Sequence, residues 1–227
     1  MRILKKIINK SVAYFGYEIK RIKKNNPQLD IEPRAHKSER DANGYNMVWN
    51  SKDFIDQYTF NHLSLYYDII EFLKDYKILD RSESIADIGC GPGNLIGLIS
   101  QKYPGKLYYG FDFSISAIEA ARDKFDNIRF QLHDIYEPLE ISFDTVICSE
   151  TLEHLLYPSK ALNNIINATM QTCVLTVPDG RLDNYQGHIN FWSEESFECF
   201  LKNHFETWDI RVQRIGLYIG AIMFKQK

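Results

Sequence analysis

The stretch DIGCGPGN, residues 87–94, decides how this chain folds. It ends an apolar, β-like run and opens an apolar, helix-like one. Glycines at alternate positions permit a tight turn and let the backbone approach a ligand closely. A dinucleotide-binding turn would read Gly-x-Gly-x-x-Gly, but Asn94 stands in place of its third glycine. No Gly-Lys-Ser/Thr follows, as a phosphate-binding P-loop requires. The stretch therefore predicts a strand, a ligand-binding turn and a helix around a site of a different kind.

Around this stretch, β-like and helix-like segments alternate along the chain. The strands are predicted at residues 84–89, 107–112, 128–132, 143–148 and 173–177, with two further β-like runs at 206–214 and 217–224. The helices are predicted near residues 93–102, 114–125, 158–170 and 193–203, after an aromatic, helix-forming region that begins at residue 45. Alternating units of this kind predict an α/β fold with a doubly wound, largely parallel sheet.

The composition is that of an ordinary globular protein, with 44% hydrophobic and 25% charged residues in a chain of 227. The four cysteines form no Cys-x-x-Cys pair, which indicates reduced thiols in a cytosolic compartment and neither a disulfide framework nor a zinc knuckle. No apolar run approaches the roughly 20 residues that span a bilayer, and no secretory signal is visible. We therefore expect a cytoplasmic protein.

The charge is distributed unevenly. Residues 1–24 contain eight Lys/Arg and one Glu, whereas the remainder carries 19 basic and 29 acidic residues. Residues 1–15 are amphipathic at helical spacing, which suits a helix on a membrane surface or a partner, or a helix packed on its own domain with a solvated basic face. Residues 25–44 are polar and aperiodic, so we predict an N-terminal segment and linker at 1–44 and a domain at 45–227. The acidic domain makes nucleic acid an unlikely partner.

Ligands of doubly wound sheets bind beyond the carboxyl ends of the strands. Asp87 lies inside the first strand, where a buried carboxylate needs a partner. Asp112 ends the second strand and can accept both hydroxyls of a ribose, and Asp134 follows the third strand, where it can accept an amine. After the fourth strand comes SETLEHL, residues 149–155.

From about residue 84 to 180 the chain resembles the class I S-adenosylmethionine-dependent methyltransferases. The matching motifs are Asp87-x-Gly89-x-Gly91-x-Gly93, Asp112, Asp134-Ile135, and Phe143-Asp144-x-Val146 leading into Glu150-x-x-Glu153-His154-Leu155. The resemblance implies an enzyme, S-adenosyl-L-methionine as its cofactor, and a seven-stranded sheet whose last hairpin adds an antiparallel strand. It implies that Asp112 binds the ribose, Phe113 and Ile135 pack on adenine, and Asp134 meets the adenine amine. The cofactor-binding residues so implied are Asp87, Gly89, Cys90, Gly91, Gly93, Asp112, Phe113, Asp134, Ile135 and Ser149.

The candidate catalytic residues are Glu150, Glu153 and His154, which share one face if their segment is helical, and His188, near the end of a long loop at 178–192. In one interpretation, His154 or His188 is a general base for a hydroxyl. In a second, all four bind a divalent metal, as in the small-RNA 3′-terminal ribose methyltransferases and some ubiquinone-pathway O-methyltransferases that this constellation resembles. In a third, His154 is a structural residue bonded to backbone. Ionisable groups at a strand-end cleft favour the two functional interpretations over the structural one, and we rank proton transfer before metal binding. The resemblance implies no metal requirement, because the Glu-x-x-Glu-His-Leu pattern is broader than the metal-dependent members of the family.

Three acceptor classes are compatible with these residues. One is a sugar hydroxyl of a cell-surface glycan or its lipid- or nucleotide-linked precursor. It is favoured by the basic N-terminus, which could contact a membrane surface, and by the resemblance of FGYEIKRI (15–22) and GHINFWS (187–193) to bacterial glycan-biosynthesis methyltransferases. The others are a quinone-like small molecule and an RNA ribose. The remaining alternative is a non-catalytic cofactor-binding module, which the complete set of glycines and Asp112 disfavours.

Overall fold

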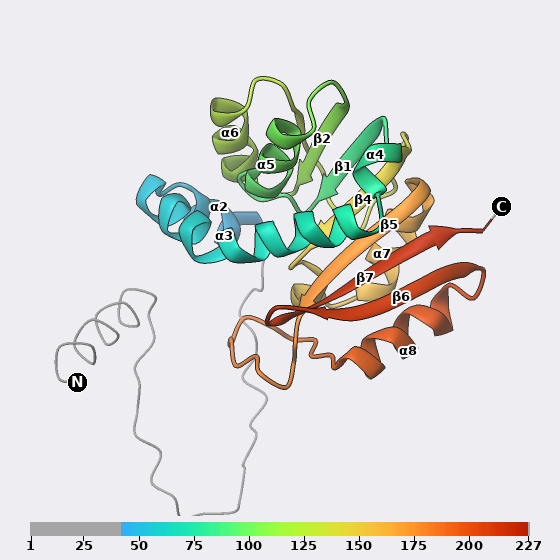
Figure 1. The fold of residues 1–227 in the computed structure, drawn as a ribbon. Helices are drawn as coiled ribbons and strands as arrows, with labels where there is room; N and C mark the ends of the chain where they lie inside the picture. The colour runs from blue at the N-terminus through green and yellow to red at the C-terminus, as the bar shows by residue number, and fades with distance from the viewer. Residues whose placement is uncertain (1–41, 227) are drawn as a thin grey trace, which may run out of the picture. The chain divides into compact units, whose positions relative to one another are not determined.

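The computed structural model describes residues 42–226, so the predictions for residues 1–41 lie outside the described part of the chain. In that part, seven strands form one sheet in the order β3-β2-β1-β4-β5-β7-β6 (Figure 1). Only β7 pairs antiparallel with its neighbours β5 and β6. The predicted seven-stranded, mostly parallel sheet is confirmed. The strands are β1 (Ser84–Ile88), β2 (Leu107–Asp112), β3 (Arg129–Leu132), β4 (Phe143–Ser149), β5 (Thr169–Pro178), β6 (Trp208–Ile215) and β7 (Tyr218–Lys225).

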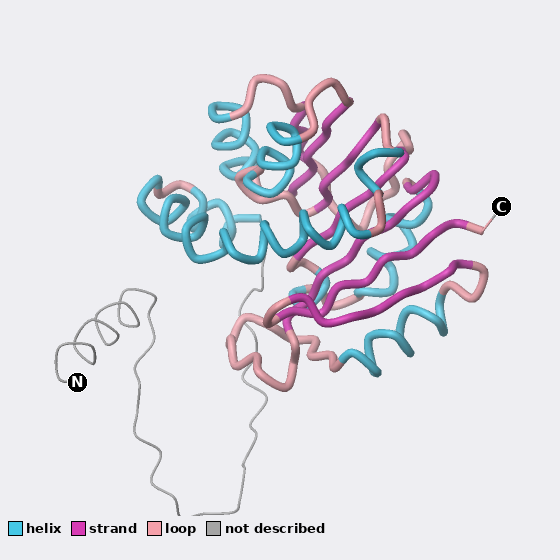
Figure 2. Tube along the Cα trace, viewed as in Figure 1, coloured by secondary structure: helices cyan, strands magenta, loops and turns pink. Residues whose placement is uncertain are grey.

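Helices cover both faces of the sheet, as Figures 1 and 2 show. The helices α3, α5 and α6 lie on one face, and α7 and α8 lie on the other. None of the helices within residues 42–226 combines the length and apolarity needed to cross a membrane. The helices are α2 (Ala42–Trp49), α3 (Lys52–Asp75), α4 (Ile78–Arg81), α5 (Asn94–Lys102), α6 (Ile115–Lys124), η1 (Leu152–His154), α7 (Pro158–Asn167) and α8 (Glu194–His204).

Two cores result, one on each face of the sheet. Successive residues of a strand point to opposite faces. In β4, Val146 and Cys148 belong to the core under α7 and α8, and Ile147 belongs to the core under α3 and α5. Central strands are therefore buried on both sides, which explains their nearly continuous apolar sequence. This packing leaves the carboxyl ends of β1 to β5 at one edge of the sheet, where their turns meet.

The boundary between α7 and β5 differs from the prediction. The helix ends at Asn167 and the strand begins at Thr169, so the helix predicted to residue 170 is too long and the strand predicted from 173 too short. The Thr169 hydroxyl donates a hydrogen bond to the Ile165 carbonyl at 2.7 Å, closing the helix, while Thr169 already pairs with Phe143 of β4. Residues 169–172 therefore pair with β4 as part of the sheet, although their apolar spacing also suits a helix. The short α4 was not predicted. Helix α2 begins at Ala42, before the predicted domain boundary at 44/45, which stays a prediction.

At the amino edge of the sheet, Asp144 ties three strands together. Its Oδ2 accepts hydrogen bonds from the amides of Glu83 and Ser84 at 2.9 and 3.0 Å, and its Oδ1 accepts one from the Gln171 side chain at 2.6 Å. Partial burial opposes ionisation, but the bonds from Ser84 and Glu83 outweigh it and lower the pKa of Asp144. The starts of β1, β4 and β5 therefore share one carboxylate.

We expect Asp144→Ala to lower the free energy of unfolding by about 1–2 kcal/mol at pH 7, because several donors lose their acceptor. The folded-state pKa lies below the unfolded value, so this stabilisation is present above about pH 4 and is lost as the pH falls through the folded pKa. Urea denaturation at pH 7 and pH 3.5 measures both effects. The control is Asp209→Ala, since Asp209 is exposed and pairs with Arg211. Equal losses in the two variants at pH 7 would contradict the assignment.

Candidate functional site

The turn after β1 requires glycine. Gly89 and Gly93 have φ of +79° and +75°, in the left-handed region that residues with a side chain rarely adopt. A Cβ on Gly89 would lie 2.3 Å from the Thr151 hydroxyl, and one on Gly93 would lie 2.7 Å from the Phe130 ring. The turn therefore approaches both the segment after β4 and the Phe130 side chain of β3, which is two strands away in the sheet.

Asp112, at the end of β2, is buried and fixes the turn. Its Oδ2 accepts a hydrogen bond from the Gly91 amide at 2.8 Å, and its Oδ1 accepts one from the Ser114 amide at 2.9 Å. Burial raises the pKa of Asp112, and the amides of Ser114 and Gly91 oppose that rise. Burial and the nearby Asp112 raise the pKa of Asp87 to about 7. A carboxylate has about four acceptor positions, so Asp112 retains capacity for the hydroxyls of a ligand.

The segments predicted to hold adenine follow β2 and β3. Phe113 is half-buried after Asp112. Asp134 is exposed and its Oδ1 accepts a hydrogen bond from the Tyr136 amide at 2.9 Å, so part of its accepting capacity closes its own turn. The Ile135 carbonyl accepts one from the Asn164 side chain at 3.0 Å. The roles of these residues toward a cofactor stay predictions.

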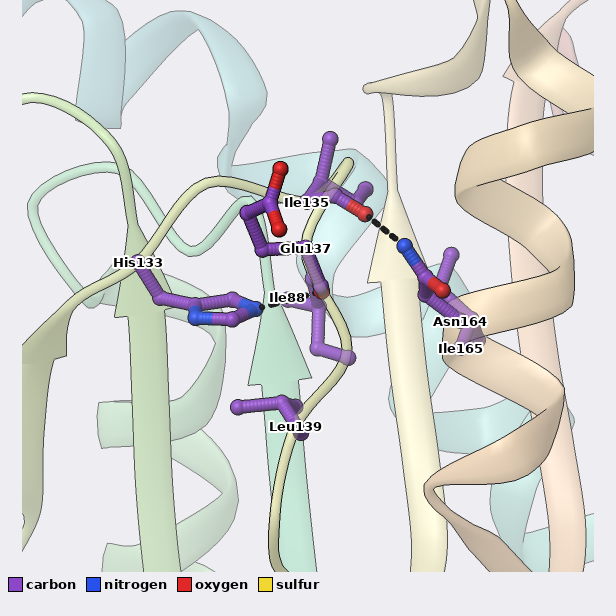
Figure 3. Close-up of a pocket in the computed structure, with 7 residues that line it drawn as sticks. All are labelled: Ile88, His133, Ile135, Glu137, Leu139, Asn164 and Ile165. Atoms are coloured by element: carbon purple, nitrogen blue, oxygen red, sulfur yellow. Dashed lines mark hydrogen bonds between the residues drawn. The ribbon is translucent and has the colours of Figure 1, made fainter.

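Figure 3 shows a small pocket beside the segment that follows β3. Its walls come from β1, the segment after β3 and α7, and they do not include the glycine turn or the residues after β4. Both hydrogen bonds drawn there hold the segment after β3 in place: Ile135 to Asn164, and His133 Nε2 with the Glu137 carbonyl at 3.1 Å. We therefore assign this pocket no ligand. The lining residues are Ile88, His133, Ile135, Glu137, Leu139, Asn164 and Ile165.

After β4, the predicted helical face is wrong for Glu150. Its φ of +50° breaks any helix, and the only helical turn in SETLEHL is η1, a 3₁₀ turn at Leu152–His154. The Glu150 Oε1 accepts a hydrogen bond from the Thr176 hydroxyl at 3.0 Å. Burial raises the pKa of Glu150 to about 8, against that bond. Glu150 therefore faces β5, while Glu153 and His154 project from a separate turn.

Glu153 and both histidines converge. Glu153 is 1% exposed, and among the described residues neither of its carboxyl oxygens has a hydrogen-bond partner. Its Oε1 lies 3.8 Å from His154 Nε2 and 3.9 Å from His188 Nε2. One ligand atom from each of the three residues lies within 4.8 Å of the others. Burial, and then the nearby Glu150, raise the pKa of Glu153. Such a group of atoms can share a proton or hold a cation.

The other nitrogen of each imidazole is already bonded. His154 Nδ1 lies 3.1 Å from the Gly187 carbonyl, and His188 Nδ1 lies 2.5 Å from Asp183 Oδ2. A carbonyl and a carboxylate only accept hydrogen bonds, so Nδ1 is the donor in both rings. The neutral tautomer then makes Nε2 the accepting nitrogen, and it faces Glu153 in both cases. The sequence analysis did not single out Asp183 as a partner of His188. The only signal in the sequence was that Asp183 is a carboxylate five residues before His188 in the same loop.

The loop at 178–192 is bound to η1 by backbone groups. Ile189 donates its amide to the Glu153 carbonyl at 2.9 Å, and the Asn190 side chain donates to the carbonyls of Leu152 and Leu155 at 3.1 and 2.7 Å. At the end of this loop Ser193 is the N-cap of α8, where its side chain accepts a hydrogen bond from the Ser196 amide. These contacts place His188 beside His154, 34 residues away in the chain. No local sequence pattern predicts this contact.

Comparison with known proteins identifies the domain. Residues 79–213 match a family model described as a methyltransferase domain. Trans-aconitate 2-methyltransferase of Escherichia coli (strain K12 / DH10B) is 29% identical over 109 residues, which is 46% of this chain and 43% of that protein. The enzyme of the same name from Variovorax paradoxus is 27% identical over 107 residues, 45% of this chain and 41% of that protein. The match thus spans less than half the length of these curated relatives.

Solved structures share the fold. Magnesium protoporphyrin IX methyltransferase from Synechocystis PCC 6803, with bound SAH, has a TM-score of 0.58 at 19% identity, covering 73% of this chain and 84% of that one. The plantazolicin methyltransferase BpumL, also with SAH, has a TM-score of 0.66 at 15% identity, covering 82% and 98%. The methyltransferase domain of bacterial CtHen1 has a TM-score of 0.60 at 18% identity, covering 72% and 98%. Because the family model matches more than half of the chain, the chain belongs to the class I S-adenosylmethionine-dependent methyltransferase family.

We expect Asp112→Ala to weaken binding of S-adenosylmethionine or its demethylated product about tenfold or more, because hydrogen bonds from ligand hydroxyls to a carboxylate are charge-assisted. Isothermal titration calorimetry measures the change, with thermal melts to show that the variant folds. The matched control is Asp126→Ala, an exposed aspartate outside the turn. Wild-type affinity in Asp112→Ala would rule out the pocket assignment.

Proposed function

From membership of this family, we propose that the chain transfers the methyl group of S-adenosylmethionine to a hydroxyl oxygen. The acceptor is a sugar of a cell-surface glycan or of its lipid- or nucleotide-linked precursor. The observation that supports transfer to oxygen is the pairing of His188 Nδ1 with Asp183 at 2.5 Å, while His188 Nε2 faces Glu153 Oε1 at 3.9 Å. A carboxylate that holds an imidazole in one tautomer makes the opposite nitrogen a base.

Methyl transfer from S-adenosylmethionine needs few catalytic groups from the protein. The sulfonium already activates the methyl group, so the chain has to position the acceptor and remove its proton. His188 takes the hydroxyl proton at Nε2, and Asp183 stabilises the imidazolium that forms. His154, whose ring centroid is 4.6 Å from that of His188, orients the acceptor hydroxyl or serves as the base in its place. The buried Glu153 lies between the two rings and can exchange a proton with either.

A sugar acceptor is supported by the rim of the site and by sequence. Tyr185 is 49% exposed, and its ring centroid lies 4.8 Å from that of His188, so its face can stack on the apolar side of a sugar ring. The resemblance of residues 15–22 and 187–193 to glycan-biosynthesis methyltransferases supports the same class. The names of the relatives do not decide the acceptor, since they include trans-aconitate, magnesium protoporphyrin IX and plantazolicin. The acidic domain argues against RNA.

A second candidate is metal-assisted methylation of a quinone-like molecule or an RNA ribose. It is favoured by the two facing Nε2 atoms and by the Glu153 carboxylate, which has no hydrogen-bond partner within residues 42–226. These three side chains suit a divalent cation that accepts imidazole and carboxylate ligands. Asp183 and the Gly187 carbonyl would orient the two imidazoles, as outer partners of metal-bound histidines do. When bound, such an ion would lower the pKa of the acceptor hydroxyl. Glu150, held on Thr176, lies outside this three-residue group.

The test is a methyl-donor assay with labelled S-adenosylmethionine and a glycan-precursor extract, with and without chelator. We expect label in the sugar fraction and no effect of chelator. His188→Ala and His154→Ala should lower kcat by about 10²–10⁴-fold, the usual range for general acid–base catalysis, with cofactor affinity nearly unchanged. The control is His204→Ala, because His204 is exposed and bonds its own helix.

The alternatives give different results in the same assay. Loss of activity on chelation, with Glu153→Ala as damaging as either histidine variant, would select the metal-assisted reaction. Label in a quinone or RNA fraction would reject the sugar. Cofactor binding without methyl transfer to any fraction would leave a non-catalytic cofactor-binding module.

We further propose that residues 1–24 hold the enzyme at an anionic membrane surface, on its cytoplasmic side, near lipid-linked acceptors. The support is the excess of eight Lys/Arg over one Glu in a segment with a one-sided apolar stripe. Deleting these residues should abolish co-sedimentation with phosphatidylglycerol vesicles and leave cofactor affinity intact. Binding of the full chain should fall between 50 mM and 500 mM salt because the attraction is screened. Full-length protein that ignores anionic vesicles at low salt would overturn the proposal.

A further inference from the structure

Helix α2 is fastened to the turn that follows Asp112. The Asn46 Oδ1 accepts a hydrogen bond from the Ser114 hydroxyl at 2.7 Å and one from the Ser116 amide at 3.3 Å. Ser114 is fully buried and is also the N-cap of α6. A buried hydroxyl that loses its acceptor is costly. Asn46 is therefore a specific latch between α2 and the segment that also presents Asp112 and Phe113.

The neighbouring residue reaches from that segment to the candidate catalytic cluster. The ring centroid of Tyr45 lies 5.2 Å from that of Phe113 and 6.3 Å from that of His154. Both contacts are edge-to-face, with interplanar angles of 66° and 85°. One side chain of α2 thus contacts a predicted cofactor residue and a candidate catalytic residue.

One helical turn further on, α2 also covers the glycine turn. Trp49 is 8% exposed, and a Cβ on Gly91 would lie 3.6 Å from its ring. Trp49 packs edge-to-face on Phe54 and Tyr58 of α3, with ring centroids at 5.6 and 5.0 Å. Side chains of α2 therefore approach the segments after β1, β2 and β4, which are separate in sequence.

We propose that Tyr45 is a positioning residue for His154, and that α2 makes this positioning depend on bound cofactor. A ligand bound to Asp112 and Phe113 orders the segment at Ser114–Ser116, to which Asn46 is hydrogen-bonded. The ordered helix then sets the Tyr45 ring against the edge of the His154 imidazole, fixing the ring plane. The consequence is that the acceptor site is complete only after the cofactor has bound. The inference rests on the proposed function only in giving His154 a role toward the acceptor.

The first experiment is hydrogen exchange on the full chain, with S-adenosylhomocysteine as the probe. In wild type, the probe should slow exchange of the α2 amides. In Asn46→Ala this protection should be lost and the affinity for the probe should fall about three- to tenfold, since a buried hydroxyl loses its acceptor. Asn46→Asp keeps an accepting oxygen and should retain the protection. The control is Asn50→Ala, since Asn50 is exposed just after α2.

The second experiment follows the His154 imidazole by NMR, assigned with His154→Gln. The same probe should shift the His154 resonance in wild type and in Tyr45→Phe, which keeps the ring, and should leave it unshifted in Tyr45→Leu. His204 supplies an internal reference. Unchanged α2 exchange in wild type on binding, or a full His154 shift in Tyr45→Leu, would overturn the inference. Failure of the probe to bind would overturn it together with the cofactor pocket. Failure of the extract to be methylated bears only on the proposed function, because neither experiment uses an acceptor.

Discussion

The buried carboxylate of Asp112 is the constraint on which the site depends. A carboxylate at 8% exposure must accept hydrogen bonds, and it takes them from Gly91 and Ser114, on two different turns. The turn after β1 and the turn after β2 are therefore fixed relative to each other. Ser114 in turn presents its hydroxyl to Asn46, so the position of α2 follows from the same carboxylate. A bond at the end of one strand thus sets the geometry of a helix that lies far earlier in the chain.

A second buried carboxylate has the opposite character. Glu153 is more deeply buried than Asp112, yet no hydrogen bond reaches its oxygens among the described residues. An unsatisfied buried carboxyl group destabilises a fold by roughly 1–3 kcal/mol. Strained or perturbed groups of this kind cluster at functional sites. Asp112 thus accepts hydrogen bonds from two turns of the fold, whereas Glu153 lies beside two imidazoles with no hydrogen bond to its oxygens among the described residues.

The sheet and the glycine turn could be predicted because their signals are local. Apolar runs of strand length recur at regular spacing, and polar residues mark the strand ends, so the sequence alone places residues such as Asp112 at the edge of the sheet. The backbone at Glu150 could not be predicted, because SETLEHL has good helical spacing and its φ of +50° reflects the pairing of β4 with β5. The contacts of Asp183 with His188 and of Tyr45 with His154 depend on the path of a long loop and on the docking of α2. Neither leaves a periodic trace in the sequence.

The predicted cofactor side and the candidate catalytic side of the site are built from different kinds of segment. This difference suggests how one fold can be used with different methyl acceptors. The predicted cofactor residues lie at the ends of β1, β2 and β4 and in the short turns after β1, β2 and β3, and the turn after β1 contains the positive-φ residues Gly89 and Gly93. The candidate catalytic residues Glu153, His154 and His188, with Tyr45 beside them, lie on η1, on the loop at 178–192 and on α2, which are anchored by side chains such as Asn46 and Asn190. Side-chain anchors can change without disturbing the sheet. Solved structures at 15–19% identity accordingly keep the fold, while their names give acceptors as different as magnesium protoporphyrin IX and plantazolicin.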